Sequence, residues 1–164
     1  DALIGEAQGE GRGFYLTMTG MVGGRLQTAA RANGVMHAAF NEAMRYATGR
    51  RVFGRPIADY PLTSVQFARM AAWLTASRQF SYAVARRLDA GADGREASLT
   101  KFFACRTAEW ITRDAMQMHG GMGYAEETVA GRLFVDARVL SIFEGAEETL
   151  ALKVIARDLL ARAS

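Results

Sequence analysis

The chain has few residues that could crosslink it or hold a structural metal. Its 164 residues include one cysteine, Cys105, and two histidines, His37 and His119. A single thiol cannot form an internal disulfide, and without a pair of cysteines no zinc-binding pattern exists. The sequence therefore predicts neither a disulfide scaffold nor a metal site.

Long apolar runs and a targeting leader are also missing. Half of the residues are hydrophobic, yet nowhere do about 18 apolar residues follow one another, as a membrane span requires. The first residues do not combine a basic segment with an apolar one, as a signal peptide would. We predict a soluble, cytoplasmic protein.

Lysine is scarce as well: eighteen arginines stand beside two lysines, Lys101 and Lys153, and the net charge is +3. The guanidinium group suits bidentate contacts to phosphate and carboxylate, although the codon usage of a GC-rich genome explains the excess equally well. No stretch rich in Lys and Arg is interleaved with aromatic residues, so binding to nucleic acid is not expected.

The hydrophobic period is helical throughout, and no alternating run of Val, Ile and Thr suggests a sheet. The pattern predicts helices at Phe14 to Thr48, Ser64 to Ala90, Arg95 to Met118, Glu126 to Phe134 and Ala146 to Arg162. In the first helix an alanine-rich stripe suits close helix approach, and in the last one Leu152, Ile155 and Leu159 are expected to face inward. The expected fold is all-α, an up-down four-helix bundle with an additional short helix.

Three segments carry the functional signal, and they follow one another along the chain. They are ATGRRVFGRPI (47–57), DAMQMHGGMGYAEE (114–127) and VLSIFEGAEETLALKVIAR (139–157). Together they resemble the C-terminal domain of the acyl-CoA dehydrogenases, flavoenzymes that introduce an α,β double bond into acyl-CoA thioesters. The segment LIGEAQGEGRGF (3–14) is similar to the one by which that family leaves its middle domain. Residues 1–13 are therefore expected to be a linker from a missing upstream domain, and residues 14–164 the helical domain.

The resemblance assigns four residues to FAD. Arg50 matches the arginine that contacts the pyrophosphate and Phe53 the aromatic residue beside it, both usually serving the FAD of the neighbouring subunit. Gln117 and Gly121 match positions on the adenosine side. The alternatives are a helix C-terminal arginine that interacts with the helix dipole and, for HGGMG, an ordinary helix C-cap.

Glu144 matches the catalytic base, which removes the α-proton of the thioester while hydride leaves the β-carbon for flavin N5. By resemblance its backbone N–H binds the substrate carbonyl, with Gly145 beside it on the substrate side. Some family members place the base on the first helix instead, where this chain has Gly24, so Glu144 is the only candidate. Arg25 follows as a substrate-side or base-orienting cation; a solvated arginine and a surface glutamate at a helix N-terminus are the plain alternatives.

The resemblance also implies partners: FAD as cofactor, acyl-CoA as substrate, a homodimer or homotetramer, and electron-transferring flavoprotein or another electron acceptor. Ala146 and Glu148 stand where the family commonly has threonine and glutamine, which fits a divergent branch. One such branch resembles the alkylation-response flavoproteins. The alternative function is therefore a non-catalytic flavoprotein domain that binds nucleic acid or serves assembly. The 164-residue chain by itself is expected to be inactive.

Overall fold

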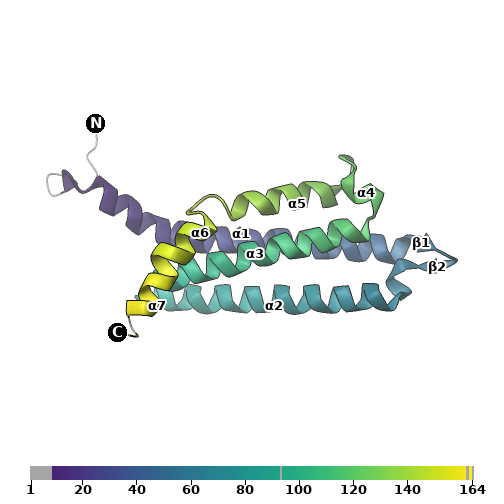
Figure 1. Ribbon diagram of the computed structural model, residues 1–164, viewed down its shortest axis with the longest axis horizontal. Coiled ribbons are helices and arrows are strands. Elements are labelled where there is room, and N and C mark those ends of the chain that lie inside the picture. The colour runs from purple at the N-terminus through teal and green to yellow at the C-terminus, as the bar shows by residue number, and fades with distance from the viewer. Residues whose placement is uncertain (1–8, 93, 162, 164) are drawn as a thin grey trace.

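The computed structural model describes residues 9–92, 94–161 and 163, and four of its helices form an up-down bundle (Figure 1). Helix α1 (Gly13–Gly49) runs along the bundle, α2 (Pro61–Asp89) returns, α3 (Arg95–Met118) runs forward again and α5 (Val129–Leu140) returns beside it. Pro61 opens α2, where its fixed φ angle suits the first helical turn. The predicted all-α class is confirmed.

A small hairpin and a single turn of 3₁₀ helix connect α1 to α2. Strand β1 (Arg51–Val52) pairs antiparallel with β2 (Arg55–Pro56), and η2 (Ile57–Asp59) follows. The two residues between the strands, Phe53 and Gly54, have φ angles of 48° and 86°. Positive φ at both central positions is the mark of a tight type I′ hairpin turn.

One hydrophobic core joins the four bundle helices. The alanine stripe predicted on α1 is fully buried, and α1 packs against α3 through the small residues of both helices. Small side chains let two helix backbones approach closely. The large core side chains are Met36, Phe67, Met70, Leu74, Ile111, Met118 and Leu140.

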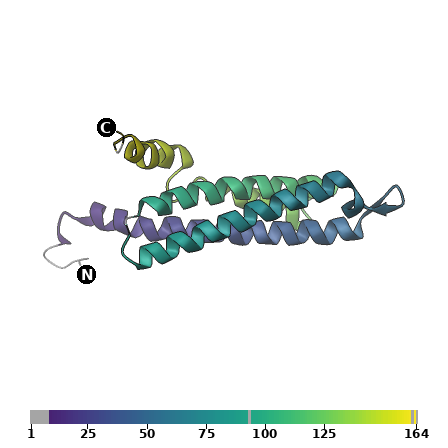
Figure 2. The ribbon, with the colours of Figure 1, turned by 90° about the horizontal axis from the view of Figure 1, so that it is seen from below.

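The end of the chain differs from the prediction. The fourth bundle helix is α5, which is longer than the short helix expected there. The last helical segment, α6 (Glu147–Leu150), η3 (Ala151–Ala156) and α7 (Arg157–Ala161), leaves the bundle at one end (Figure 2). Leu152 and Leu159, expected to face inward, are 68% and 60% exposed. The physical reason is that α5 already fills the fourth position of the bundle.

The first helix begins at Gly13, one residue before the expected start. Of the expected linker 1–13, residues 1–8 lie outside the described residues. Within the part of the chain that the structure describes, no helix is both long and apolar enough to cross a bilayer.

Candidate active site

The loop between α5 and α6, residues 141–146, presents Glu144 in an uncommon backbone conformation. Glu144 has a φ angle of 57° and Gly145 one of 98°. Glycine adopts positive φ freely, whereas another residue pays roughly 1–3 kcal/mol for it. Among the described residues only Glu144 and Phe53 are non-glycine residues with positive φ. Such strained positions cluster at functional sites, and both residues were selected from the sequence as site candidates.

The carboxylate of Glu144 lies directly against Gly24 on α1. A Cβ atom built on Gly24 would stand 2.7 Å from Oε2 and 3.4 Å from Oε1 of Glu144. The missing side chain at position 24 therefore makes the space that the carboxylate fills. Gly24 and Glu144, the two positions that the sequence resemblance suggests for a base, thus face each other in this fold.

Arg25, the next residue on α1, is buried rather than solvated, with 8% of its surface exposed. Its Nη1 donates a hydrogen bond of 3.1 Å to the hydroxyl of Ser98 on α3. Burial lowers the pKa of Arg25, and the charge of Glu144 opposes that effect. Within the described residues its Nε atom has no hydrogen-bond partner. A buried cation with an unused donor thus follows Gly24 directly on α1, close enough for its charge to interact with Glu144 although the two groups form no direct ion pair.

Lys101 on α3 was not selected from the sequence, yet it is the side chain that holds the loop. It is 0% exposed, and its Nζ donates to the carbonyl oxygens of Ser141 at 3.2 Å and Gly145 at 2.6 Å. Burial lowers the pKa of Lys101, and the nearby thiol of Cys105 and carboxylate of Glu147 oppose this. The sequence signal was available: Lys101 occupies an inward position of α3, between the fully buried alanines of that helix.

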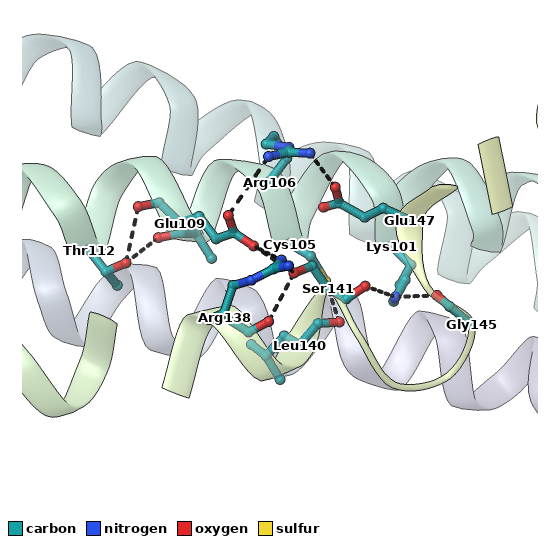
Figure 3. A network of polar contacts seen from close by, with 11 residues as sticks. Lys101, Cys105, Arg106, Glu109, Thr112, Arg138, Leu140, Ser141, Gly145 and Glu147 are labelled. Atoms are coloured by element: carbon teal, nitrogen blue, oxygen red, sulfur yellow. Dashed lines mark hydrogen bonds and ion pairs between the residues drawn. The ribbon is translucent and has the colours of Figure 1, made fainter. Parts of the chain in front are cut away.

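Further polar contacts fasten the two ends of the loop to α3 (Figure 3). The Ser141 hydroxyl donates to Glu109 at 2.6 Å and accepts from Arg138 at 2.6 Å, and Arg138 also pairs with Glu109 at 2.9 Å. At the other end, Arg106 pairs with the buried Glu147 at 2.5 Å. The Glu147 N–H closes the loop with a 3.2 Å hydrogen bond to the Ser141 carbonyl.

The residues assigned to FAD lie at the opposite end of the bundle from Glu144. Arg50 caps the C-terminal end of α1, and Gln117 and Gly121 lie at the end of α3 (Figure 1). The two helix ends meet where the rings of Tyr46 and His119 stack at 4.1 Å. Gly24 and Arg50 are separated by about 39 Å of helix at a rise of about 1.5 Å per residue. The structure therefore forms two groups of predicted site residues, not one.

The second group presents side chains that are free to bind a ligand. Phe53 is 95% exposed at the tip of the hairpin. Burial of its ring therefore does not offset the strain of its positive φ angle. The side chains of Arg50 and Gln117 are exposed and make no hydrogen bond to any other described residue. A Cβ atom on Gly121 would meet nothing within 4 Å, so the space above this glycine is open to a ligand. An aromatic face, a guanidinium fork and an amide are the groups that bind adenine, phosphate and ribose.

Two surface grooves, of about 600 and 650 Å³, involve other residues. The first lies between α1 and α2 and is lined by Leu26, Asn33 and Tyr82, among others, and the second lies beside α4 (Gly121–Tyr124) and α5. Neither is lined by any of the residues assigned to catalysis or to FAD.

Comparison with known protein families shows to which family the chain belongs. Residues 11–160 match the family model described as the C-terminal domain of acyl-CoA dehydrogenase. The chain belongs to the acyl-CoA dehydrogenase family. The resemblance read from the three sequence segments is thereby confirmed.

Individual proteins are also similar to this chain in sequence and structure. A 3-(aryl)acrylate reductase of Clostridium sporogenes is 39% identical over 150 residues, which cover 91% of this chain and 40% of the relative. The butyryl-CoA dehydrogenase structure from Megasphaera elsdenii matches with a TM-score of 0.87 and 34% identity, covering 92% of this chain and 39% of that one.

A glutaryl-CoA dehydrogenase structure from Mycobacterium smegmatis in complex with FADH2 matches with a TM-score of 0.80 and 26% identity, over 85% of this chain and 36% of that one. The chain thus spans about two fifths of the length of the reductase and of the butyryl-CoA dehydrogenase.

Proposed function

We propose that this chain is the C-terminal domain, residues 14–164, of a longer FAD-dependent oxidoreductase that dehydrogenates acyl-CoA thioesters between the α and β carbons. Residues 1–13 would connect it to a middle domain. Glu144 is the base, Arg25 and Gly145 lie on the substrate side, and Arg50, Phe53, Gln117 and Gly121 bind FAD. The alternative, a non-catalytic flavoprotein domain for nucleic acid or assembly, gains no support from the geometry of Glu144.

The observation that carries the proposal is the placement of Glu144. Its backbone is strained, its carboxylate occupies the space above Gly24, and its charge acts on the buried Arg25, the next residue of α1. A surface glutamate that only interacts with a helix dipole needs none of these features. A base that must reach a fixed carbon atom needs a fixed carboxylate.

The chain's own groups account for proton removal. A Glu144 oxygen would accept the α-proton of the thioester, and the electron pair of that C–H bond would become part of the α,β double bond. Bound FAD would accept the hydride that leaves the β-carbon. The backbone N–H of Glu144 forms no hydrogen bond with another described residue, so it is free to donate to the thioester carbonyl, where negative charge develops.

The separation of the two residue groups bears on assembly. About 39 Å of helix between Gly24 and Arg50 is more than one dinucleotide can bridge. Glu144 and Arg50 of the same chain would therefore serve different FAD molecules, which requires at least a homodimer and is compatible with a homotetramer. Electron-transferring flavoprotein or another electron acceptor would reoxidise the flavin. The cytoplasmic location of the protein stays a prediction.

The test is flavin reduction by acyl-CoA in the full-length protein that contains this chain. Glu144→Gln should retain FAD but reduce it roughly 10²–10⁴-fold more slowly, as expected for loss of a general base. Glu148→Gln is the matched control, because Glu148 lies four residues further along and is exposed. Normal anaerobic bleaching of the flavin in Glu144→Gln would refute the assignment. Equal loss in both variants would make the effect non-specific.

A further inference from the structure

Lys101 is an unusual residue to find inside this bundle. It is 0% exposed and lies on α3 among the fully buried Ala97, Ala104 and Ala108. A buried ammonium group is costly unless its surroundings replace the water it has lost. No carboxylate of the described residues lies within 4.0 Å of its Nζ atom. The compensating groups are backbone carbonyls instead.

Those carbonyls belong to the two ends of one loop. Nζ reaches the Ser141 oxygen at the start of the loop and the Gly145 oxygen next to Glu144, at 3.2 and 2.6 Å. Figure 3 shows the side chain pointing from α3 into the curve of the loop. The Lys101 ammonium group thus links the two ends of the loop. It also fixes the peptide group between Gly145 and Ala146, directly after Glu144 and Gly145.

The loop needs such a constraint. Glu144 and Gly145 are consecutive residues with positive φ, and a conformation that side chains rarely adopt persists only where the surroundings over-determine it. The other contacts of the loop, from Glu109 to Ser141 and from Arg106 to Glu147, act on its two flanks. Lys101 is the side chain that joins the two ends of the loop directly, through the Ser141 and Gly145 carbonyls.

We propose that Lys101 is the positioning residue for the base: its ammonium group fixes the loop so that the Glu144 carboxylate stays above Gly24. This inference rests on the proposed function of Glu144. Lys101 itself touches neither the carboxylate nor the reacting atoms, and it acts through the Ser141 and Gly145 carbonyls. The need to hold the loop explains why position 101, which faces the core of the bundle among alanines, carries a lysine.

The experiment uses the full-length holoenzyme with Lys101→Met, which nearly preserves side-chain volume and removes all three donors. Lys153→Met is the control, because Lys153 is the other lysine of the chain and is exposed. In Lys101→Met the rate constant of flavin reduction should fall about 10²-fold, the scale expected for a misplaced catalytic group. Flavin content, melting temperature and the KM for acyl-CoA should change little. Amide hydrogen exchange of residues 142–146 should accelerate.

A second variant covers the case in which Lys101→Met does not fold. In Lys101→Gln a shorter, neutral amide can still donate, so the reduction rate should lie between those of Lys101→Met and the wild type. Parallel loss of flavin, melting temperature and rate would make Lys101 a structural residue and overturn the positioning role. Failure of both variants to fold would overturn it in the same way.

The two proposals fail differently. If no acyl-CoA reduces the wild-type flavin, the proposed function is wrong, and hydrogen exchange alone still decides whether Lys101 holds the loop. If the wild type is reduced and Lys101→Met is reduced equally fast, the function stands and the positioning role is wrong. Unchanged exchange at residues 142–146 in Lys101→Met would also refute it.

Discussion

The Oε2 atom of Glu144 occupies the place where a side chain at Gly24 would begin, 2.7 Å from an ideal Cβ position on that glycine. The contact joins the first bundle helix to the loop that follows the fourth. Because the carboxylate is the flexible end of its side chain, it can be displaced without disturbing the helices. A substitution at this contact should therefore change the reaction rate without lowering the stability of the fold.

Gly24→Ala is the first such substitution. Alanine is favoured over glycine inside a helix by roughly 1 kcal/mol, so the variant should be as stable as the wild type or more so. The new methyl group should push the Glu144 carboxylate aside and lower the rate of flavin reduction by about tenfold or more. Gly23→Ala is the matched control, because a Cβ there meets nothing within 4 Å. Equal rates in the two variants would show that the close approach does not matter.

Phe53→Gly should separate stability from cofactor binding at the hairpin. The Phe53 ring is 95% exposed and its backbone has positive φ, so glycine removes strain without removing burial. We expect an unchanged or up to about 1 kcal/mol larger free energy of unfolding, together with a lower flavin content after dialysis. Leu62→Ala, which truncates another exposed apolar side chain nearby, should leave both unchanged. Full flavin retention in Phe53→Gly would remove Phe53 from the FAD site.

The glycines of HGGMG should respond differently to alanine. A Cβ at Gly121 has open space, whereas one at Gly123 would overlap the backbone oxygen of Met116. Gly123→Ala should therefore destabilise the domain by roughly 1–3 kcal/mol, as overpacking does. Gly121→Ala should fold normally and bind FAD more weakly. Thermal unfolding and flavin content, measured on both variants, check the pair; a stable Gly123→Ala or a fully flavinylated Gly121→Ala would contradict it.

Glu147 should give the domain a pH-dependent stability of definite sign. Burial raises the pKa of Glu147 above its ordinary 4.5, although Arg106 partly offsets this. Between pH 4.5 and the raised pKa, Glu147 is protonated more often in the folded state than in the unfolded state. Its contribution to the free energy of unfolding therefore falls as the pH rises through this range. The free energy of unfolding of the wild type relative to Glu147→Gln should therefore decrease, by up to about 1.4 kcal/mol per pH unit. Denaturant titrations of both proteins from pH 4.5 upward measure the difference, and an increase would contradict the burial of Glu147 as an unfavourable charge.

The sequence predicted the parts of this fold that depend on local pattern. The alanine stripe of α1 and the face of α3 from Ala104 to Met118 are buried as expected, because helical period alone decides which side of a long helix is apolar. Leu152 and Leu159 have the same period and are exposed. They are exposed because α5 fills the fourth position of the bundle, which the period of the last helix does not encode.

The candidate site shows the same division. Glu144 and Phe53 could be selected from short motifs, and both proved to be the strained positions of the described chain. The contact between Glu144 and Gly24 could not be predicted, because it joins residues far apart in sequence through tertiary packing. Lys101 could have been noticed as a lone charge in an apolar stripe, but its acceptors are backbone carbonyls, which leave no signature in the side-chain sequence.

The central claim is that the Glu144 carboxylate removes the α-proton, and exchange at that carbon tests it most directly. Acyl-CoA carrying deuterium at the α-carbon is incubated in ordinary water with the full-length protein, and the loss of deuterium is followed by mass spectrometry. The wild type should wash out the label, while Glu144→Gln, with flavin still bound, should do so about 10²-fold more slowly or not at all. Washout at the wild-type rate in Glu144→Gln would contradict the account.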